Sequence, residues 1–251
     1  GQLRCWGGNS FAEVGNGTHA PVLSPTAPTG IGIALGVAVG AMRTCAILVD
    51  RSLMCWGART PSQQLYWGIP VPSRYPPQPI TGLRDVALVS IGRSRDCAVL
   101  TTGKVQCWSY LEASLPDEQG ADNTAPVNVA GITRAVTLTN NGSSFCALES
   151  DGGMVCWGDD NIAKSALLSV PVARLSLSIS GGCLLQFAGT AQCWGYNFFG
   201  ELGNGTYVAS NEAPVNVKGL GTQKGDVLDI GMDYDHACVL LGDGRVMCWG
   251  T

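Results

Sequence analysis

The chain has few charged residues and no long apolar run. Lysine and arginine contribute 15 of its 251 residues, and aspartate and glutamate contribute 19. Charged residues make up 14% of the chain, against about 25% in an average globular domain. The net charge of −4 excludes the basic surface that non-specific binding to nucleic acid or to an anionic membrane requires. No stretch reaches the roughly 18 apolar residues that span a bilayer, so we expect no membrane span.

Histidine is also scarce. Only His19 and His236 occur, and there is no Gly-x-Ser-x-Gly motif. The sequence therefore offers no recognisable combination of a nucleophile, a base and an orienting residue. We predict no cofactor and no catalytic residues.

Cysteine is abundant, and its spacing reveals a repeat. Apart from Cys5, the 11 cysteines form five pairs whose members are ten residues apart. Successive units of cysteine followed by tryptophan are separated by 50, 52, 49, 37 and 55 residues, which indicates a tandem repeat. The tryptophans of these units are Trp6, Trp56, Trp108, Trp157, Trp194 and Trp249.

Each cysteine pair brackets a predicted β-hairpin. Glycines lie at matching positions in four of the five connections, at Gly103, Gly152, Gly189 and Gly244. Such a connection suits a type I turn closed by a glycine in the left-handed conformation. The two cysteines would then face each other at a Cα separation of about 4.5–5.5 Å, which a disulfide can bridge. We predict the disulfides Cys45–Cys55, Cys97–Cys107, Cys146–Cys156, Cys183–Cys193 and Cys238–Cys248.

Metal binding is the alternative role for these cysteines. Zinc ligands are usually spaced as C-x2-C or C-x4-C and need further cysteine or histidine ligands. The spacing of ten and the two histidines fit that pattern poorly, so we favour disulfides and predict no metal site. Because disulfides persist outside the reducing cytosol, the protein is expected to be extracellular or secreted.

The cysteine-bearing strands read as continuous apolar runs, for example 45–49 (CAILV) and 238–241 (CVLL). Strands of this kind are covered on both faces. A small sheet that recurs at this period and is covered on both faces is typical of a β-propeller blade, with about four strands. In each repeat we expect a strand before the first cysteine (such as 85–91), the two cysteine strands and a Pro-Val strand.

Longer motifs also recur. Segment 9–18 (NSFAEVGNGT) returns as 197–206 (NFFGELGNGT), and 125–129 (APVNV) returns as 213–217. With the unit 231–250 (GMDYDHACVLLGDGRVMCWG), they resemble the regulator of chromosome condensation (RCC1-like) repeat family. The cysteine-bearing form is similar to secreted bacterial members and to plant crinkly-type receptor ectodomains. The resemblance implies an all-β propeller, commonly of seven blades, that serves as an interaction scaffold. It does not imply the founding member's nuclear guanine-nucleotide exchange, which the acidic, cystine-rich composition contradicts.

The sequence accounts for about five complete four-stranded blades plus an incomplete one, each complete blade with one internal disulfide. We expect residues 1–251 to form a single propeller domain, which has either fewer blades than seven or further blades in a longer chain. Cys5 has no cysteine ten positions before it. We expect it to pair with a strand from outside these residues or from a neighbouring copy, with a free buried thiol as the alternative.

Three sequons, at Asn16, Asn141 and Asn204, are candidate glycosylation sites. At Asn16 and Asn204 the alternative is structural, because Gly-Asn-Gly-Thr is itself the loop motif of the family. Tyr66, Trp67 and Tyr75 lie in a proline-rich loop, 61–79, and are candidate partner-binding residues. The alternative is that these rings fold back on their own blade, and the same two interpretations apply to Phe198 and Phe199.

Two acidic clusters, Asp159-Asp160 and Asp233 with Asp235, could bind calcium, but paired loop carboxylates are more often solvated turn residues. His236 matches a family position, and we interpret it as structural. The favoured function is an extracellular interaction or structural scaffold for a protein or glycan partner. The alternatives are an extracellular enzyme that acts on polysaccharide or peptide through those carboxylates, and an intracellular exchange factor. A cleft holding two carboxylates with raised pKa values would favour the enzyme.

Overall fold

The computed structural model describes residues 1–40, 42–57, 77–93, 95–109, 125–158, 164–166, 171–220 and 226–251. All regular secondary structure in these ranges is β-strand, as the sequence predicts. None of the described residues forms a helix that could cross a bilayer. The chain divides into two compact units, Gly1–Thr133 and Arg134–Thr251. That all 251 residues form one domain therefore stays a prediction.

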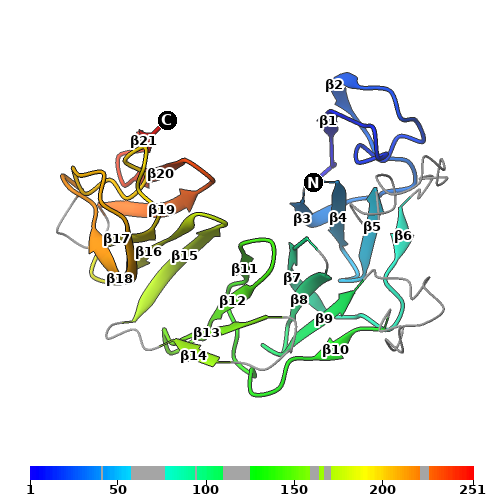
Figure 1. Ribbon diagram of the computed structural model, residues 1–251. Helices are drawn as coiled ribbons and strands as arrows, with labels where there is room; N and C mark the ends of the chain where they lie inside the picture. The colour runs from blue at the N-terminus through cyan, green and yellow to red at the C-terminus, as the bar shows by residue number, and fades with distance from the viewer. Residues whose placement is uncertain are drawn as a thin grey trace, which may run out of the picture. The chain divides into compact units, whose positions relative to one another are not determined.

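Within the described residues, the first unit contains three antiparallel sheets, in which strands consecutive in the chain pair with each other (Figure 1). The two-stranded sheet holds β1 (Cys5–Gly7) and β2 (Val22–Thr26). The next sheet holds β3 (Ala34–Val39), β4 (Arg43–Leu48), β5 (Leu53–Gly57) and β6 (Gln78–Pro79). The third holds β7 (Val86–Ile91), β8 (Arg95–Leu100), β9 (Val105–Ser109) and β10 (Val127–Asn128).

The second unit also contains three antiparallel meanders. One holds β11 (Thr139–Asn140), β12 (Phe145–Leu148), β13 (Met154–Trp157) and β14 (Lys164–Ala166). The next holds β15 (Val172–Ser178), β16 (Gly181–Gln186), β17 (Ala191–Gly195) and β18 (Ser210–Asn216). The last holds β19 (Val227–Met232), β20 (His236–Leu241) and β21 (Val246–Gly250). These small meanders are the predicted blades; four have four strands, and the sheets at the two ends of the sequence have two and three strands in the described residues.

One disulfide lies within each of the five hairpins that the cysteine spacing marks. The two cysteines of each pair are directly opposite, with Cα atoms 4.0–4.1 Å apart. The turns also match the sequence: Gly103 has φ of 80° and its N–H donates to the Leu100 carbonyl at 2.8 Å. Arg51 takes this left-handed position in the first hairpin, with φ of 62°. The disulfides are Cys45–Cys55, Cys97–Cys107, Cys146–Cys156, Cys183–Cys193 and Cys238–Cys248.

The apolar faces of neighbouring sheets pack into shared cores. In the first unit, β7 packs against β3 and β4, and Ile47, Leu53, Val86 and Ile91 are buried in the same cluster. In the second unit, β15 packs against β19, and β11 and β12 pack against β15. This burial of both faces explains the continuous apolar runs of the cysteine strands.

The tryptophan after each cysteine projects to the opposite face of its strand, because successive side chains alternate. Trp56 is buried against the loop that follows β1, and its Nε1–H donates to the Glu13 carbonyl at 2.8 Å. Trp249 repeats this contact in the second unit, where its Nε1–H donates to the Glu201 carbonyl at 2.7 Å. This packing does not extend to Trp6, which is 62% exposed. β1 belongs to a two-stranded sheet, so fewer neighbours cover its ring.

Replacement of Gly15 by alanine tests this packing. A Cβ at Gly15 would lie 2.6 Å from Trp56 Nε1, whereas a Cβ at Gly17 would meet nothing within 4 Å. Both glycines have positive φ, 75° and 80°, so both variants carry a similar backbone cost. We expect Gly15→Ala to lower the free energy of unfolding by about 1–3 kcal/mol more than Gly17→Ala, the usual cost of overpacking. Equal losses in chemical denaturation would contradict the packing of Trp56 on this glycine.

Candidate functional site: an aromatic loop surface in the second unit

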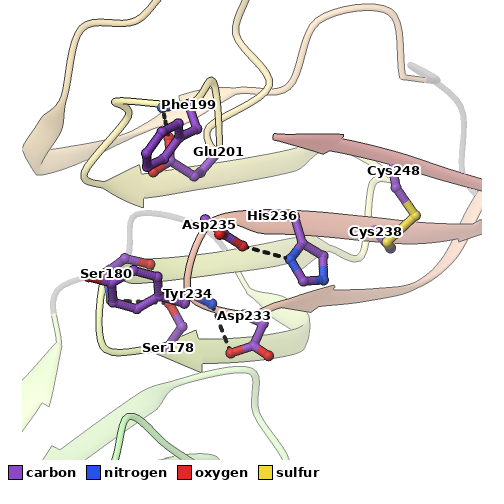
Figure 2. A network of polar contacts seen from close by, with 10 residues as sticks. All are labelled: Ser178, Ser180, Phe199, Glu201, Asp233, Tyr234, Asp235, His236, Cys238 and Cys248. Carbon is purple, nitrogen blue, oxygen red and sulfur yellow. Dashed lines mark hydrogen bonds and ion pairs between the residues drawn. A yellow bond between two sulfur atoms is a disulfide. The ribbon is translucent and has the colours of Figure 1, made fainter. Parts of the chain in front are cut away.

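The loops at one end of the second-unit sheets carry the exposed aromatic residues. In an antiparallel meander, the first and third connections leave the sheet at the same end. In the β15–β18 sheet these connections are the turn at 179–180 and the loop at 196–209. They touch each other, because the Tyr196 N–H donates to the Ser180 carbonyl at 2.8 Å. Figure 2 shows this turn, part of this loop and the β19–β20 turn in one region.

A buried asparagine holds the loop after β17 in a fixed shape. The side-chain amide of Asn197 donates to the carbonyls of Thr206 at 2.9 Å and Val208 at 3.1 Å, and its Oδ1 accepts from the Leu202 N–H at 2.9 Å. The Glu201 carboxylate accepts from the Phe199 N–H at 2.8 Å (Figure 2). Since both polar side chains are buried and satisfied, the loop is a rigid support for the residues that project from it.

The loop after β1 in the first unit has the same hydrogen bonds. Asn9 donates to the carbonyls of Thr18 at 2.9 Å and Ala20 at 3.1 Å and accepts from the Val14 N–H at 2.9 Å. Glu13 accepts from the Phe11 N–H at 2.8 Å, as Glu201 does from Phe199. We call this set of contacts the loop frame. It belongs to the repeat, so it does not by itself indicate a function.

The two loops share the frame but differ in the side chains that project from it. Gly8 and Ser10 of the first loop correspond to Tyr196 and Phe198 of the second. The rings of Tyr196 and Phe198 stack with their centroids 5.6 Å apart. Tyr196 is 50% exposed and Phe198 is 71% exposed. Three further aromatics are exposed on the same loop and on the β19–β20 turn. We call the five residues the aromatic loop surface: Tyr196, Phe198, Phe199, Tyr207 and Tyr234.

A pocket of about 540 Å³ opens beside this surface, between the β11–β14 and β15–β18 sheets. Tyr196 belongs to both the pocket and the aromatic loop surface. The other walls include Trp194, Ile179 and the Cys146–Cys156 disulfide. A volume of this size is within the range of small-molecule sites, about 300–1,000 Å³.

The carboxylates of the β19–β20 turn do not form an acid–base pair of the predicted kind. Asp233 Oδ1 accepts from the Tyr234 N–H at 2.8 Å, and Asp235 Oδ1 lies 3.0 Å from His236 Nδ1 (Figure 2). The hydrogen bond from His236 lowers the pKa of Asp235. A general acid needs a raised pKa, so this turn does not support glycosidase-like chemistry. Asp159 and Asp160 lie outside the described residues, and calcium binding there stays untested.

The other predicted sites have mixed outcomes. Asn16 Oδ1 accepts from the Thr18 hydroxyl and Asn204 Oδ1 from the Thr206 hydroxyl, both at 2.9 Å, within the loop motif itself. Asn141 Oδ1 accepts from the Ser144 N–H at 2.8 Å, at the edge of the pocket. Glycosylation of the three asparagines stays a prediction. Tyr66, Trp67 and Tyr75 lie outside the described residues.

Cys5 is a free, partly buried thiol, and burial raises its pKa. Its strand β1 pairs with β2, where Cys5 faces Thr26. Within the described residues β1 has no second neighbouring strand, whereas β5, the equivalent strand of the next sheet, pairs on both sides. The partner predicted for Cys5 stays a prediction.

A buried ion pair in the first unit was missed from the sequence. Arg43 Nε on β4 lies 3.7 Å from Asp96 Oδ2 on β8, and both side chains are buried. Burial raises the pKa of Asp96 to about 7, opposed by the Arg43 charge and a hydrogen bond with the Gly92 backbone. Cys45, Cys55 and Asp96 lie close enough together to hold a metal ion, but the two sulfurs are bonded to each other and cannot act as thiolate ligands. The signal available in the sequence was a charged residue directly before Cys97, within an apolar strand.

Comparisons with known proteins agree with this fold. The Regulator of chromosome condensation (RCC1) repeat matches residues 230–251. The structure of human WBSCR16 has a TM-score of 0.78 at 18% identity, over 98% of this chain and 70% of that chain. Prp20p from Saccharomyces cerevisiae has a TM-score of 0.74 at 19% identity, over 99% of this chain and 66% of that one. This chain therefore spans about two thirds of the length of these proteins.

The consecutive small antiparallel sheets and the similar folds define an all-β repeat protein of the β-propeller class. Residues 230–251 match an RCC1 repeat, and the two solved structures share the fold of the chain.

The Asp96 carboxyl predicts a pH dependence of stability. Its folded pKa, about 7, is above the ordinary 3.8, so between these values the folded state retains a proton that the unfolded chain releases. The contribution of this group to stability is therefore greatest below pH 3.8 and is lost as the pH rises through about 7. Asp96→Asn cannot titrate, and we expect it to make the free energy of unfolding fall less steeply over this range than in the native protein. Chemical denaturation at several pH values measures the slopes, with exposed Asp233→Asn as control. An Asp96→Asn slope equal to that of the native protein would contradict the assignment.

Proposed function

We propose that the chain is an extracellular, non-catalytic interaction module whose blade loops bind a protein or glycan partner. The observation that carries the proposal is the aromatic loop surface, held on a rigid loop frame in the second unit. Exposed tyrosine and phenylalanine side chains on ordered loops are typical anchors of binding interfaces, because they offer large contact areas at a low entropy cost. The loop frame of the first unit, which lacks the Tyr196–Phe198 pair, indicates that folding of the loop does not require it.

The disulfides support the extracellular part of the proposal. Five cystines in a chain of 251 residues are typical of proteins that mature in an oxidising compartment. The same feature argues against an intracellular exchange factor. The net charge of −4 argues against nucleic acid as the partner.

The similar structures support a binding role. The Prp20p structure was described with its binding properties to Gsp1p and histones, and another structure shows yeast RCC1 (Prp20) bound to Kap60. Those partners are all proteins, which is consistent with a propeller used for protein interaction. We do not carry over the particular partners, since the identity to those chains is 19% and 14%.

Replacement of Phe199 tests the proposal. Its ring is half exposed, and the loop frame uses only its backbone N–H, so Phe199→Ser should leave the fold intact. We expect this variant to reduce capture of the partner about tenfold, because loss of an aromatic anchor usually removes a large share of the binding energy. The measurement is quantitative cross-linking and affinity capture from the extracellular fraction of the native source.

Phe187→Ser is the matched control. Phe187 is 56% exposed and follows β16, at the opposite end of the same sheet. It should leave capture unchanged. Equal effects of the two variants, or no capture above background by the native protein, would contradict the proposed function.

A further inference from the structure

The pocket beside the aromatic loop surface is lined by uncharged groups. None of its described lining residues is Lys, Arg, Asp, Glu or His. Its polar lining comes from Asn141, Ser144, Ser178 and Ser180, and Trp194 and Tyr196 are its aromatic lining residues. A charged ligand would lose its hydration here without gaining a counter-charge, so the lining favours a neutral ligand.

The serine pair can still hydrogen-bond a ligand. Ser178 Oγ and Ser180 Oγ are 2.7 Å apart and both residues are buried. Each hydroxyl has one proton, and the bond between them uses one of the two. Ser178 Oγ also accepts from the Ser180 N–H at 3.2 Å, so the pair retains one donor and two acceptor lone pairs. These groups match the mixed donors and acceptors of a polyhydroxylated molecule.

The aromatic wall of the pocket is not required by the loop frame. Gly8 stands at the position of Tyr196 in the first unit, where the same hydrogen bonds form without an aromatic side chain. In the second unit Tyr196 is half exposed and lines the pocket, and its ring stacks on Phe198. A flat ring at the edge of a hydroxyl-lined pocket can contact the apolar C–H face of a sugar ring while its hydroxyls bond to the polar lining.

We propose that this pocket binds a neutral sugar residue of a glycan. The Tyr196 ring contacts the face of the sugar, and Ser178, Ser180 and Asn141 bond its hydroxyls. This inference rests on the proposed function and narrows the partner to a neutral glycan. A protein partner is favoured less, because the polar groups gather around a pocket of about 540 Å³, a volume suited to a small ligand.

Isothermal titration of the full chain tests the ligand class. The probes are the neutral hexasaccharides of β-linked glucose, N-acetylglucosamine and mannose, with hexagalacturonate as the charged counterpart. We expect saturable binding of at least one neutral hexasaccharide and at least about tenfold weaker binding of hexagalacturonate. Binding of no neutral hexasaccharide, or preference for hexagalacturonate, would overturn the proposal.

Variants that copy the first unit test the site. Tyr196→Gly introduces the residue at position 8, and Phe198→Ser introduces the residue at position 10, so both are compatible with the loop frame. We expect Tyr196→Gly to weaken hexasaccharide binding about tenfold or more, and Phe198→Ser to weaken it less. Thermal unfolding of both variants verifies that they are folded, and Phe198→Ser provides the test if Tyr196→Gly is not.

Tyr207→His is the matched control, because His19 stands at this position in the first unit. Tyr207 is an exposed aromatic on the same loop that does not line the pocket. It should leave binding within about twofold of the native value. Binding that is insensitive to both Tyr196→Gly and Phe198→Ser, or equally sensitive to Tyr207→His, would place the sugar elsewhere and overturn the proposal.

Hexasaccharide binding and protein capture, measured on the same variants, distinguish failure of the sugar site from failure of the interaction module. If no hexasaccharide binds but capture of a protein still depends on Phe199, the sugar site is wrong and the interaction module stands. If a protein partner is lost with Tyr196→Gly and no hexasaccharide binds, the pocket receives a protein, which also overturns the sugar site. Hexasaccharide binding that depends on Tyr196 supports both.

Discussion

The disulfide-locked hairpin is the constraint on which the rest of this structure depends. Each disulfide joins residues directly opposite on two antiparallel strands, so the register of the hairpin cannot slip. Because side chains alternate along a strand, fixing Cys55 on one face also fixes Trp56 on the other. The tryptophan then packs against the loop of the preceding sheet, as the Trp56 bond to the Glu13 carbonyl shows. The covalent bond inside one blade thereby positions the contact between blades.

The residues that hold the loop in shape differ from the residues that project from it toward solvent. The loop frame built by Asn9 and Glu13 in the first unit is the same as the frame built by Asn197 and Glu201 in the second. Side chains that project from the frame can change without loss of its hydrogen bonds. The Tyr196–Phe198 pair is such a change, and it is adjacent to a described pocket with uncharged polar groups in its lining.

The repeat made most of the fold predictable. The spacing of ten located the five disulfide-bonded hairpins, and the strand expected at 85–91 is observed at Val86–Ile91. The site was less predictable, because exposure of a loop aromatic depends on packing that a single sequence does not show. Phe198 and Phe199 were recognised as loop aromatics, but Tyr196 and Tyr234 were not, and the proposed partner residues near Trp67 lie outside the described residues. The Arg43–Asp96 pair joins two sheets, so neither residue is near the other in the sequence.

Oxidised hairpins set the register of the five sheets that contain a disulfide. The most direct test of this claim is non-reducing proteolysis and mass spectrometry of the protein purified from its natural source. We expect five cystine-linked peptides, each joining cysteines that are ten residues apart. Disulfides between different repeats, or free thiols at these ten positions, would contradict it.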